Sequence, residues 1–224
     1  MRFPWQYNNL NRPTQYGVIG IGRFGTSVVE TLVDLGYEVL AIDPEEKNIE
    51  RVRNIATYTA VVDVTNEKEL EETGITNVDV AIICLSDLEM NILATMIVKE
   101  LGIKYIIARG LNDNHMEILK LIGVDWIVCP EKEMGRRIAQ KMAIPGITDL
   151  MDAIPEARVI EITPTPDLIG KKIHDLTLTT RRVLVLGIRR NGSAIIVPSP
   201  EELIRPNDKI YLFGAPSALE DFIT

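Results

Sequence analysis

The chain has 224 residues, of which 46% are hydrophobic, and a formal net charge of -8. This is enough apolar material for one large domain or two unequal ones with a substantial core. The acidic balance argues against sequence-independent binding to nucleic acid, because phosphate contacts need a basic face. Apolar runs such as VAIICL are far shorter than the roughly 20 residues that span a bilayer. We therefore expect a globular, cytoplasmic protein without a transmembrane helix.

Residues 1–14 are expected to form an N-terminal lead, with too little apolar content for a signal-peptide core. Phe3, Trp5 and Tyr7 alternate with other residue types in this lead. Two interpretations stay open: the lead is disordered, or its aromatic side chains contact a neighbouring molecule.

Residues 15–142 alternate short apolar runs with longer runs of helical period. This pattern predicts an α/β fold, a Rossmann-like doubly wound parallel sheet with helices on both faces. Gly36 and Gly102 are expected to end two of the helices. The predicted strands are Tyr16–Ile19, Glu38–Ile42, Thr59–Val62, Val80–Leu85, Tyr105–Ala108 and Trp126–Cys129.

The sequence GIGRFG follows the first predicted strand and opens a helix, and Asp43 ends the second strand. In a dinucleotide-binding fingerprint, Gly20 permits the tight turn, Gly22 the approach of a phosphate, and Gly25 close packing of the helix. The helix N-terminus supplies free amides and a favourable dipole. The carboxylate of Asp43 would bind ribose hydroxyls, and its charge argues against a cofactor with a 2'-phosphate, such as NADP.

Three further charged residues follow predicted strands or the first glycines. Asp63 either receives an adenine amino group, or Asp63 or Thr65 only caps the next helix. Arg23 is either a solvated side chain or a cation that grips terminal phosphates. Arg109 is placed by the strand topology at the same edge of the sheet, unless it only pairs with an acid on a neighbouring helix.

Catalytic and metal-binding patterns are weak in this sequence. Cys84 and Cys129 are far apart and are predicted to be buried free thiols, with no Cys/His spacing typical of a metal site. His115 and His174 are predicted to be structural or surface residues. A nucleotide site without a general acid or base favours sensing over hydride transfer.

Residues 143–156 contain Pro145, Gly146 and Pro155 and are predicted to be a linker or crossover around one short turn of helix. Residues 157–224 are expected to form a small C-terminal domain. Asn191-Gly192 predicts a hairpin there, since both residues tolerate positive φ. Ser217 is expected to cap a closing helix.

Taken in order, GIGRFGTS, GYEVLAID, CLSDLEMN, IIARG and VCPEKEMGRRIAQKM resemble the RCK (also called KTN) proteins, and specifically the regulatory subunits of Ktr/Trk potassium-uptake systems. The tail resembles the C-terminal RCK domain of that family. The resemblance covers nearly the whole chain.

The resemblance implies a cytoplasmic subunit without enzymatic activity, whose dimers assemble into an octameric ring below a membrane potassium-translocating partner. It implies ATP or ADP as the ligand, with NAD or NADH as the alternative, and Arg23 as the residue that reaches the terminal phosphate. The predicted nucleotide-binding residues are Gly20, Ile21, Gly22, Arg23, Phe24, Gly25, Asp43, Asp63, Val64, Leu85, Ser86 and Arg109.

Two further sites follow from the resemblance alone. Glu131 of PEKEMG is similar to a position that binds a cation between subunits; otherwise it is an acid at a helix start. Cyclic di-AMP binds the C-terminal domains of some members, and Arg189, Arg190 and Asn191 are the polar residues near the hairpin. The competing functions are a soluble NAD-dependent oxidoreductase and a stand-alone dinucleotide sensor.

Overall fold

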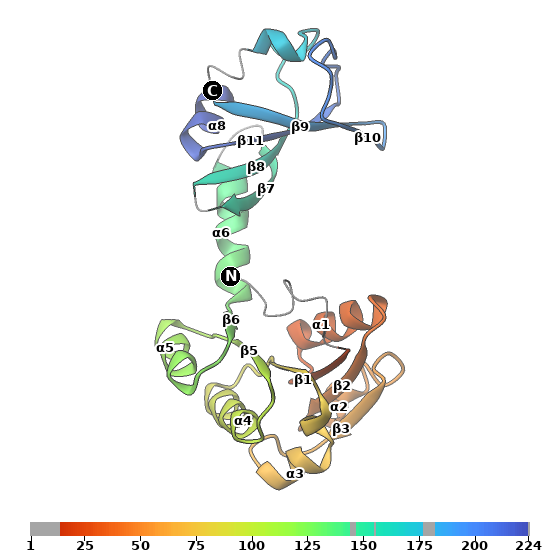
Figure 1. The fold of residues 1–224 in the computed structure, drawn as a ribbon, viewed down its shortest axis with the longest axis vertical. Coiled ribbons are helices and arrows are strands. Elements are labelled where there is room, and N and C mark those ends of the chain that lie inside the picture. Colours follow the sequence, from red (N-terminus) through yellow and green to blue (C-terminus); the bar gives the residue numbers. More distant parts are fainter. Residues whose placement is uncertain (1–13, 144–146, 155, 177–181, 224) are drawn as a thin grey trace. The chain divides into compact units, whose positions relative to one another are not determined.

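The computed structural model describes residues 14–143, 147–154, 156–176 and 182–223 (Figure 1). Phe3, Trp5 and Tyr7 lie outside this part. The chain divides into two compact units, Met1–Pro130 and Glu131–Thr224. No helix in the described ranges combines the length and the apolar character that crossing a membrane requires.

The first unit contains a six-stranded sheet in the order β3-β2-β1-β4-β5-β6, in which every neighbouring pair is parallel. The order reverses between β1 and β4, as in a doubly wound fold, so the predicted fold class is confirmed. β4 ends at Ile83 rather than at the predicted Leu85. The strands are β1 Gln15–Ile19, β2 Glu38–Asp43, β3 Tyr58–Val61, β4 Val80–Ile83, β5 Tyr105–Arg109 and β6 Trp126–Val128.

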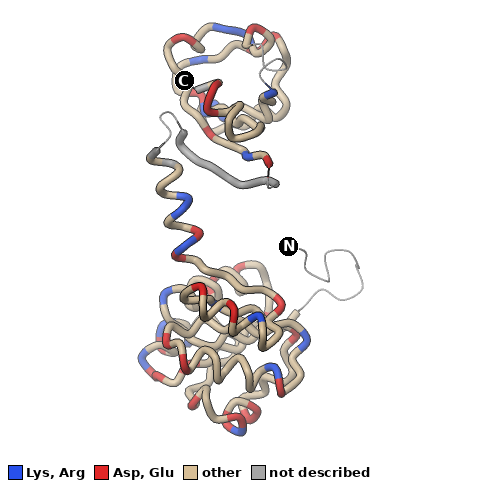
Figure 2. The backbone as a smooth tube through the Cα atoms, turned by 90° about the vertical axis from the view of Figure 1, so that its left-hand side faces the viewer, with Lys and Arg blue, Asp and Glu red and all other residues tan. Residues whose placement is uncertain are grey.

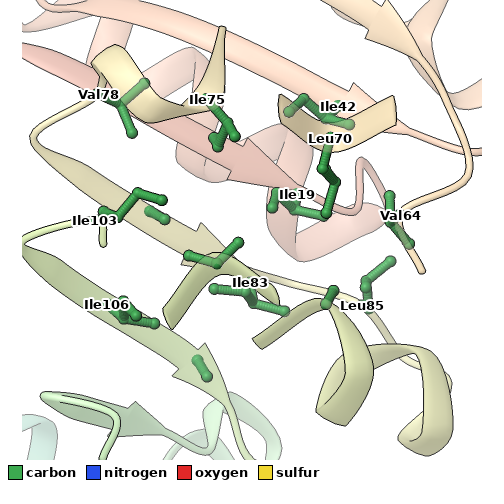
Figure 3. Packing of buried hydrophobic residues seen from close by; sticks show 14 of the residues in the cluster. Ile19, Ile42, Val64, Leu70, Ile75, Val78, Ile83, Leu85, Ile103 and Ile106 are labelled. Carbon is green, nitrogen blue, oxygen red and sulfur yellow. The ribbon is translucent and has the colours of Figure 1, made fainter. Parts of the chain in front are cut away.

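Helices cover both faces of this sheet (Figure 1). Alternate strand residues point to opposite faces, so each face presents apolar side chains that pack against helices. One core cluster joins Ile19 and Ile83 to α3, α4 and α5, and Figure 3 shows its side chains. The other joins Val18 and Ile82 to α1 and α2. The helices are α1 Arg23–Asp34, α2 Glu46–Ile49, α3 Glu67–Glu72, α4 Leu88–Glu100 and α5 Asp113–Ile122, with the 3-10 turn η2 at Ile75–Asn77.

The second unit contains a five-stranded antiparallel sheet in the order β10-β9-β11-β8-β7. Its own core is built from strand residues such as Ile160 and Leu212, with Leu219 and Phe222 of α8 packed against them. Its elements are α6 Pro130–Ala143, β7 Ile147–Ile154, β8 Ala157–Ile162, η3 Ile173–Leu176, β9 Val183–Arg190, β10 Ser193–Ile196, β11 Lys209–Gly214 and α8 Pro216–Ile223. Figure 2 shows acidic and basic residues interspersed in both units and along α6.

The hairpin prediction is confirmed. Arg190 pairs with Ser193, and the two residues between them have positive φ, 49° at Asn191 and 82° at Gly192. These angles belong to the turn type whose twist matches that of the flanking strands.

Two local predictions are wrong. Residues 147–154 form β7, not a turn of helix, because this segment pairs with β8, for example Met151 with Val159. That partner is set by the tertiary fold and outweighs local preference. Ser217 is not a cap, because α8 already begins at Pro216, whose fixed φ suits the first helical position.

Candidate nucleotide-binding site

The predicted site residues of the first unit lie at the carboxyl ends of five neighbouring strands. The glycine loop follows β1, and Asp43 is the last residue of β2. Asp63 and Val64 follow β3, Leu85 and Ser86 follow β4, and Arg109 ends β5. In doubly wound sheets this edge, at the point where the strand order reverses, is where ligands bind.

Gly20 and Gly25 are required by the backbone of the loop. Gly20 has a φ of 95°, and its amide donates to the Ile42 carbonyl at 2.8 Å. A methyl group on Gly20 would lie 2.8 Å from the Leu85 amide nitrogen, and one on Gly25 would lie 2.0 Å from the Gly20 carbonyl oxygen. Glycine at both positions therefore allows the loop to pack directly on the start of α1 and on the end of β4.

Gly22 differs from these two glycines because a methyl group built on it would have no atom within 4 Å. Gly22 occupies the N-cap position of α1, where no side chain caps the helix and the first turn holds no acidic residue. The hydroxyl oxygen of Thr26, in the same turn, is buried and has no hydrogen-bond partner among the described residues. An uncapped helix start with open space before it fits a phosphate group.

Asp43 has a structural role within the site. It is 3% exposed, and its Oδ2 accepts from the Ile21 amide at 2.6 Å. Its Oδ1 accepts from the Glu45 amide at 2.8 Å and from Asn48 Nδ2 at 2.9 Å. A carboxylate offers about four acceptor positions, so about one is left for a sugar hydroxyl. Asp43 thus holds the glycine loop through the same group that was predicted to bind ribose.

Several predicted contact residues have buried side chains. Ile21 and Val64 are 0% exposed and Leu85 is 7% exposed. Figure 3 shows Val64 and Leu85 in the cluster that also contains Ile19. Phe24 is half-buried against the core on the α1 face. In this conformation, mainly the backbone of Ile21, Val64 and Leu85 would be available to a ligand at the candidate site.

The polar residues around the loop are more accessible. Arg23, the first residue of α1, is exposed, and no described residue forms an ion pair with it. Ser86 is also exposed. Arg109 is half-buried, and its carbonyl accepts from Asn91 Nδ2 at 3.2 Å.

Asp63 is exposed and forms a local turn. Its Oδ1 accepts from the amide and the hydroxyl of Thr65, and these bonds lower the pKa of Asp63. Neither Asp63 nor Thr65 caps α3. The cap is Asn66, whose side chain accepts from the amides of Lys68 and Glu69. The prediction that Asp63 or Thr65 caps this helix is therefore wrong.

In the second unit, Arg190 is held by a buried ion pair. Its Nε and one Nη each donate to Asp208 at 2.8 Å, and the other Nη donates to Glu202 at 2.7 Å. Asp208 is 0% exposed, and these bonds raise the pKa of Arg190. Arg190 is therefore a structural residue in this conformation. Arg189 donates to Glu161 at 3.1 Å, and Asn191 is in the hairpin turn.

The remaining titratable candidates are scattered. Glu131 is an exposed residue in the first turn of α6, and the described residues contain no group of three or more His, Cys, Asp or Glu side chains that suits a metal ion. Cys84 is buried as predicted, and burial raises the pKa of its thiol to about 12. Cys129 is only half-buried, contrary to prediction. His115 is 0% exposed and His174 is exposed, as expected for structural and surface residues.

A hollow of about 610 Å³ opens at the opposite edge of the sheet. Its lining includes Gln15 and Tyr16 of β1, Glu38 of β2 and Tyr58 of β3, all at the amino ends of their strands. Because ligands of such sheets bind at the carboxyl ends, the glycine loop, not this hollow, is the candidate nucleotide site.

Two buried or half-buried amides at the site were missed from the sequence. Asn48 bonds Asp43, and Asn91 bonds the carbonyls of Leu85 and Arg109. The available signal for Asn91 was a polar residue inside the apolar helical run NILATMIV. Asn48 carried no such signal, because α2 is short and mostly polar.

Both units of the chain match known protein domains. Residues 16–130 match the TrkA-N domain, and residues 158–224 match the TrkA-C domain. The chain is 33% identical to Ktr system potassium uptake protein A of Bacillus subtilis (strain 168), covering 93% of this chain and 95% of that protein. It is 31% identical, with the same coverage, to Ktr system potassium uptake protein C of that organism.

Among solved structures, the GsuK RCK domain superposes with a TM-score of 0.50 at 20% identity, covering 93% of this chain. The chain spans 45% of that longer structure, and the match concerns the fold. With both domain matches in order along one polypeptide, the chain belongs to the family of proteins that join a TrkA-N domain to a TrkA-C domain.

Proposed function

We propose that the chain is the cytoplasmic, nucleotide-sensing regulatory subunit of a Ktr/Trk-type potassium-uptake system and that it gates a potassium-translocating membrane partner. The gating role is supported by the alignment with two Ktr system potassium uptake proteins over 93% of the chain. Dimers that assemble into an octameric ring would carry the conformational change to the partner at the inner face of the membrane. The subunit binds its nucleotide without turning it over.

The observation that carries nucleotide sensing is the uncapped start of α1 in front of the open space at Gly22. Backbone amides of this turn would bind the phosphates, and Asp43 would bind the sugar through its remaining acceptor position. The exposed cation of Arg23 at the same helix start favours terminal phosphates, and hence ATP or ADP, over NAD or NADH. A ligand can act as the switch only if it binds the two ring conformations with different affinity.

Gly22→Ala separates binding from folding. Its methyl group has open space in the free protein, and the φ of -75° at Gly22 is accessible to alanine. We expect only a small loss of thermal stability without ligand, since alanine caps a helix less well than glycine, and at least tenfold weaker binding of ATP, ADP and NAD, measured by calorimetry. Arg23→Ala should weaken ATP binding more than ADP binding. Wild-type affinity for every nucleotide in Gly22→Ala would contradict the assigned phosphate site.

The gating role needs a separate measurement. Potassium uptake is measured in a transport-deficient bacterium that expresses a Ktr-type membrane subunit with and without this chain. We expect uptake to require the chain and to fall in Gly22→Ala. Hydride transfer from NADH to small carbonyl substrates would instead support the oxidoreductase alternative. Nucleotide binding without any effect on uptake would support the stand-alone sensor.

A further inference from the structure

Asn91, near the start of α4, is a polar residue with 0% exposure. Its Nδ2 donates to the Leu85 carbonyl at 3.0 Å and to the Arg109 carbonyl at 3.2 Å. Because a carbonyl oxygen only accepts, the amino group of the Asn91 amide must face both of them. The two bonds therefore fix the orientation of this side chain.

The two carbonyls belong to neighbouring strand ends. β4 and β5 pair in parallel, and the last pair in their register is Ile83 with Ala108. Leu85 and Arg109 lie just beyond that pair. Asn91 thus connects the two backbones where the strand ladder has ended.

Both strand ends belong to the candidate nucleotide site. The Cys84 amide donates to the Ile19 carbonyl at 2.7 Å, and Gly20 has no room for a side chain because of the Leu85 backbone. On the other side, the Gly110 amide donates to the Val128 carbonyl at 2.8 Å. A shift of Leu85 would therefore move the wall on which the glycine loop packs.

The amide oxygen Oδ1 of Asn91 is buried without a hydrogen-bond partner among the described residues. Burying an acceptor without a hydrogen bond destabilises the folded protein. A leucine at this position would fill a similar volume and would carry no such acceptor. The favourable interactions of the Asn91 side chain that offset this cost are its two bonds to the strand ends. They distinguish Asn91 from a residue that only packs.

We infer that Asn91 is a positioning residue of the nucleotide site, holding the backbones of Leu85 and Arg109 in the arrangement that accepts an adenine nucleotide. The inference rests on the proposed function, since it assigns Asn91 a role in that same site. In this role Asn91 would act on a bound nucleotide indirectly, through the backbones of Leu85 and Arg109.

The test compares Asn91→Leu with Thr95→Val. Thr95 is equally buried one turn later on α4, but among the described residues its hydroxyl bonds only the Asn91 carbonyl, at 2.6 Å. Amide hydrogen exchange is measured without ligand at Cys84 and Gly110, with Ile106 as the reference, because Ile106 bonds Asp125 at the other end of β5. ADP affinity is measured by calorimetry at low temperature on folded protein.

For Asn91→Leu we expect exchange at Cys84 and Gly110 to accelerate at least tenfold, with less than threefold change at Ile106, and ADP binding to weaken at least fivefold. Thr95→Val should change ADP affinity less than twofold. Exchange at Cys84 and Gly110 within threefold of wild type, or ADP affinity within twofold, would overturn the inference. If Asn91→Leu does not fold, Asn91→Ala, which carries no side-chain donor and so removes both bonds, is held to the same criteria.

Failure of the proposed function gives a different result. In that case wild-type protein binds none of ADP, ATP and NAD, and the nucleotide role of Asn91 falls with it. If wild type binds ADP and the folded Asn91 variant binds it equally well, only the positioning inference fails.

Discussion

The Asp43 carboxylate accepts a hydrogen bond from the Ile21 amide at 2.6 Å, so the end of β2 holds the glycine loop that follows β1. Two more donors, the Glu45 amide and Asn48 Nδ2, bind the other oxygen of the same carboxylate. The carboxylate therefore links the loop, the strand end and α2.

Asp43→Ala should reduce both stability and nucleotide affinity. The substitution leaves three donors without their acceptor, and the free energy of unfolding should fall by about 2 to 4 kcal/mol. Urea unfolding of the free protein measures this change. A loss below about 1 kcal/mol would mean that Asp43 serves the ligand and not the loop.

Asn48→Ala should affect sugar recognition more than stability. Asp43 keeps its bonds to Ile21 and Glu45 in this variant, but its Oδ1 loses the bond from Asn48. We expect ATP affinity to fall by roughly three- to tenfold, and 2'-deoxy-ATP affinity to fall less. Asn54→Ala, at an exposed position after α2, is the matched control. Equal losses for both nucleotides would argue against orientation of Asp43 by Asn48.

Gly25→Ala should disrupt the loop in the free protein, in contrast to Gly22→Ala. The added methyl group would lie 2.0 Å from the Gly20 carbonyl oxygen, so the start of α1 must shift away from the turn. We expect a loss of about 3 kcal/mol of unfolding free energy, near the upper end for overpacking. Thermal and urea unfolding of both alanine variants checks this. Similar stability of the two would contradict the loop geometry.

The sequence predicted the parallel sheet and the glycine loop because both depend on local pattern. Runs such as VAIICL match a buried strand, and the spacing from Gly20 to Asp43 is contained in one βαβ unit. β7 was missed because its strand state depends on pairing with β8. The role of Asn91 was missed because one of its acceptors, the Arg109 carbonyl, is 18 residues away and comes close only after folding.

Asp208→Ala should destabilise the C-terminal unit. Asp208 is 0% exposed and accepts two bonds from Arg190, so its loss leaves a largely buried guanidinium with Glu202 as its remaining ion-pair partner. We expect about 3 kcal/mol of lost unfolding free energy, measured by denaturant unfolding. Lys171→Ala, at an exposed position of the same unit, should change it by less than about 0.5 kcal/mol. A small effect in Asp208→Ala would show that Glu202 and the Leu203 carbonyl together satisfy Arg190.

His115 should make the first unit less stable in mild acid. Its side chain is 0% exposed, its Nδ1 accepts from the Leu111 amide at 3.2 Å, and burial lowers its pKa. The folded state therefore holds the neutral form, while the unfolded chain binds a proton near the ordinary pKa of about 6.5. Stability is then fully present above that value and declines as the pH falls from there toward the lower folded-state pKa.

The measurement is urea unfolding from pH 7.5 to 5.5 in wild type, His115→Asn and His174→Asn. The chain has two histidines, and His174 is exposed, so it serves as the control. His115→Asn should be less stable at pH 7.5 but should lose most of the pH dependence, whereas His174→Asn should keep it. Carboxyl groups, with ordinary pKa values of about 4, titrate below this pH range and should contribute little to the slope. An unchanged slope in His115→Asn would mean that a group other than His115 accounts for the acid sensitivity.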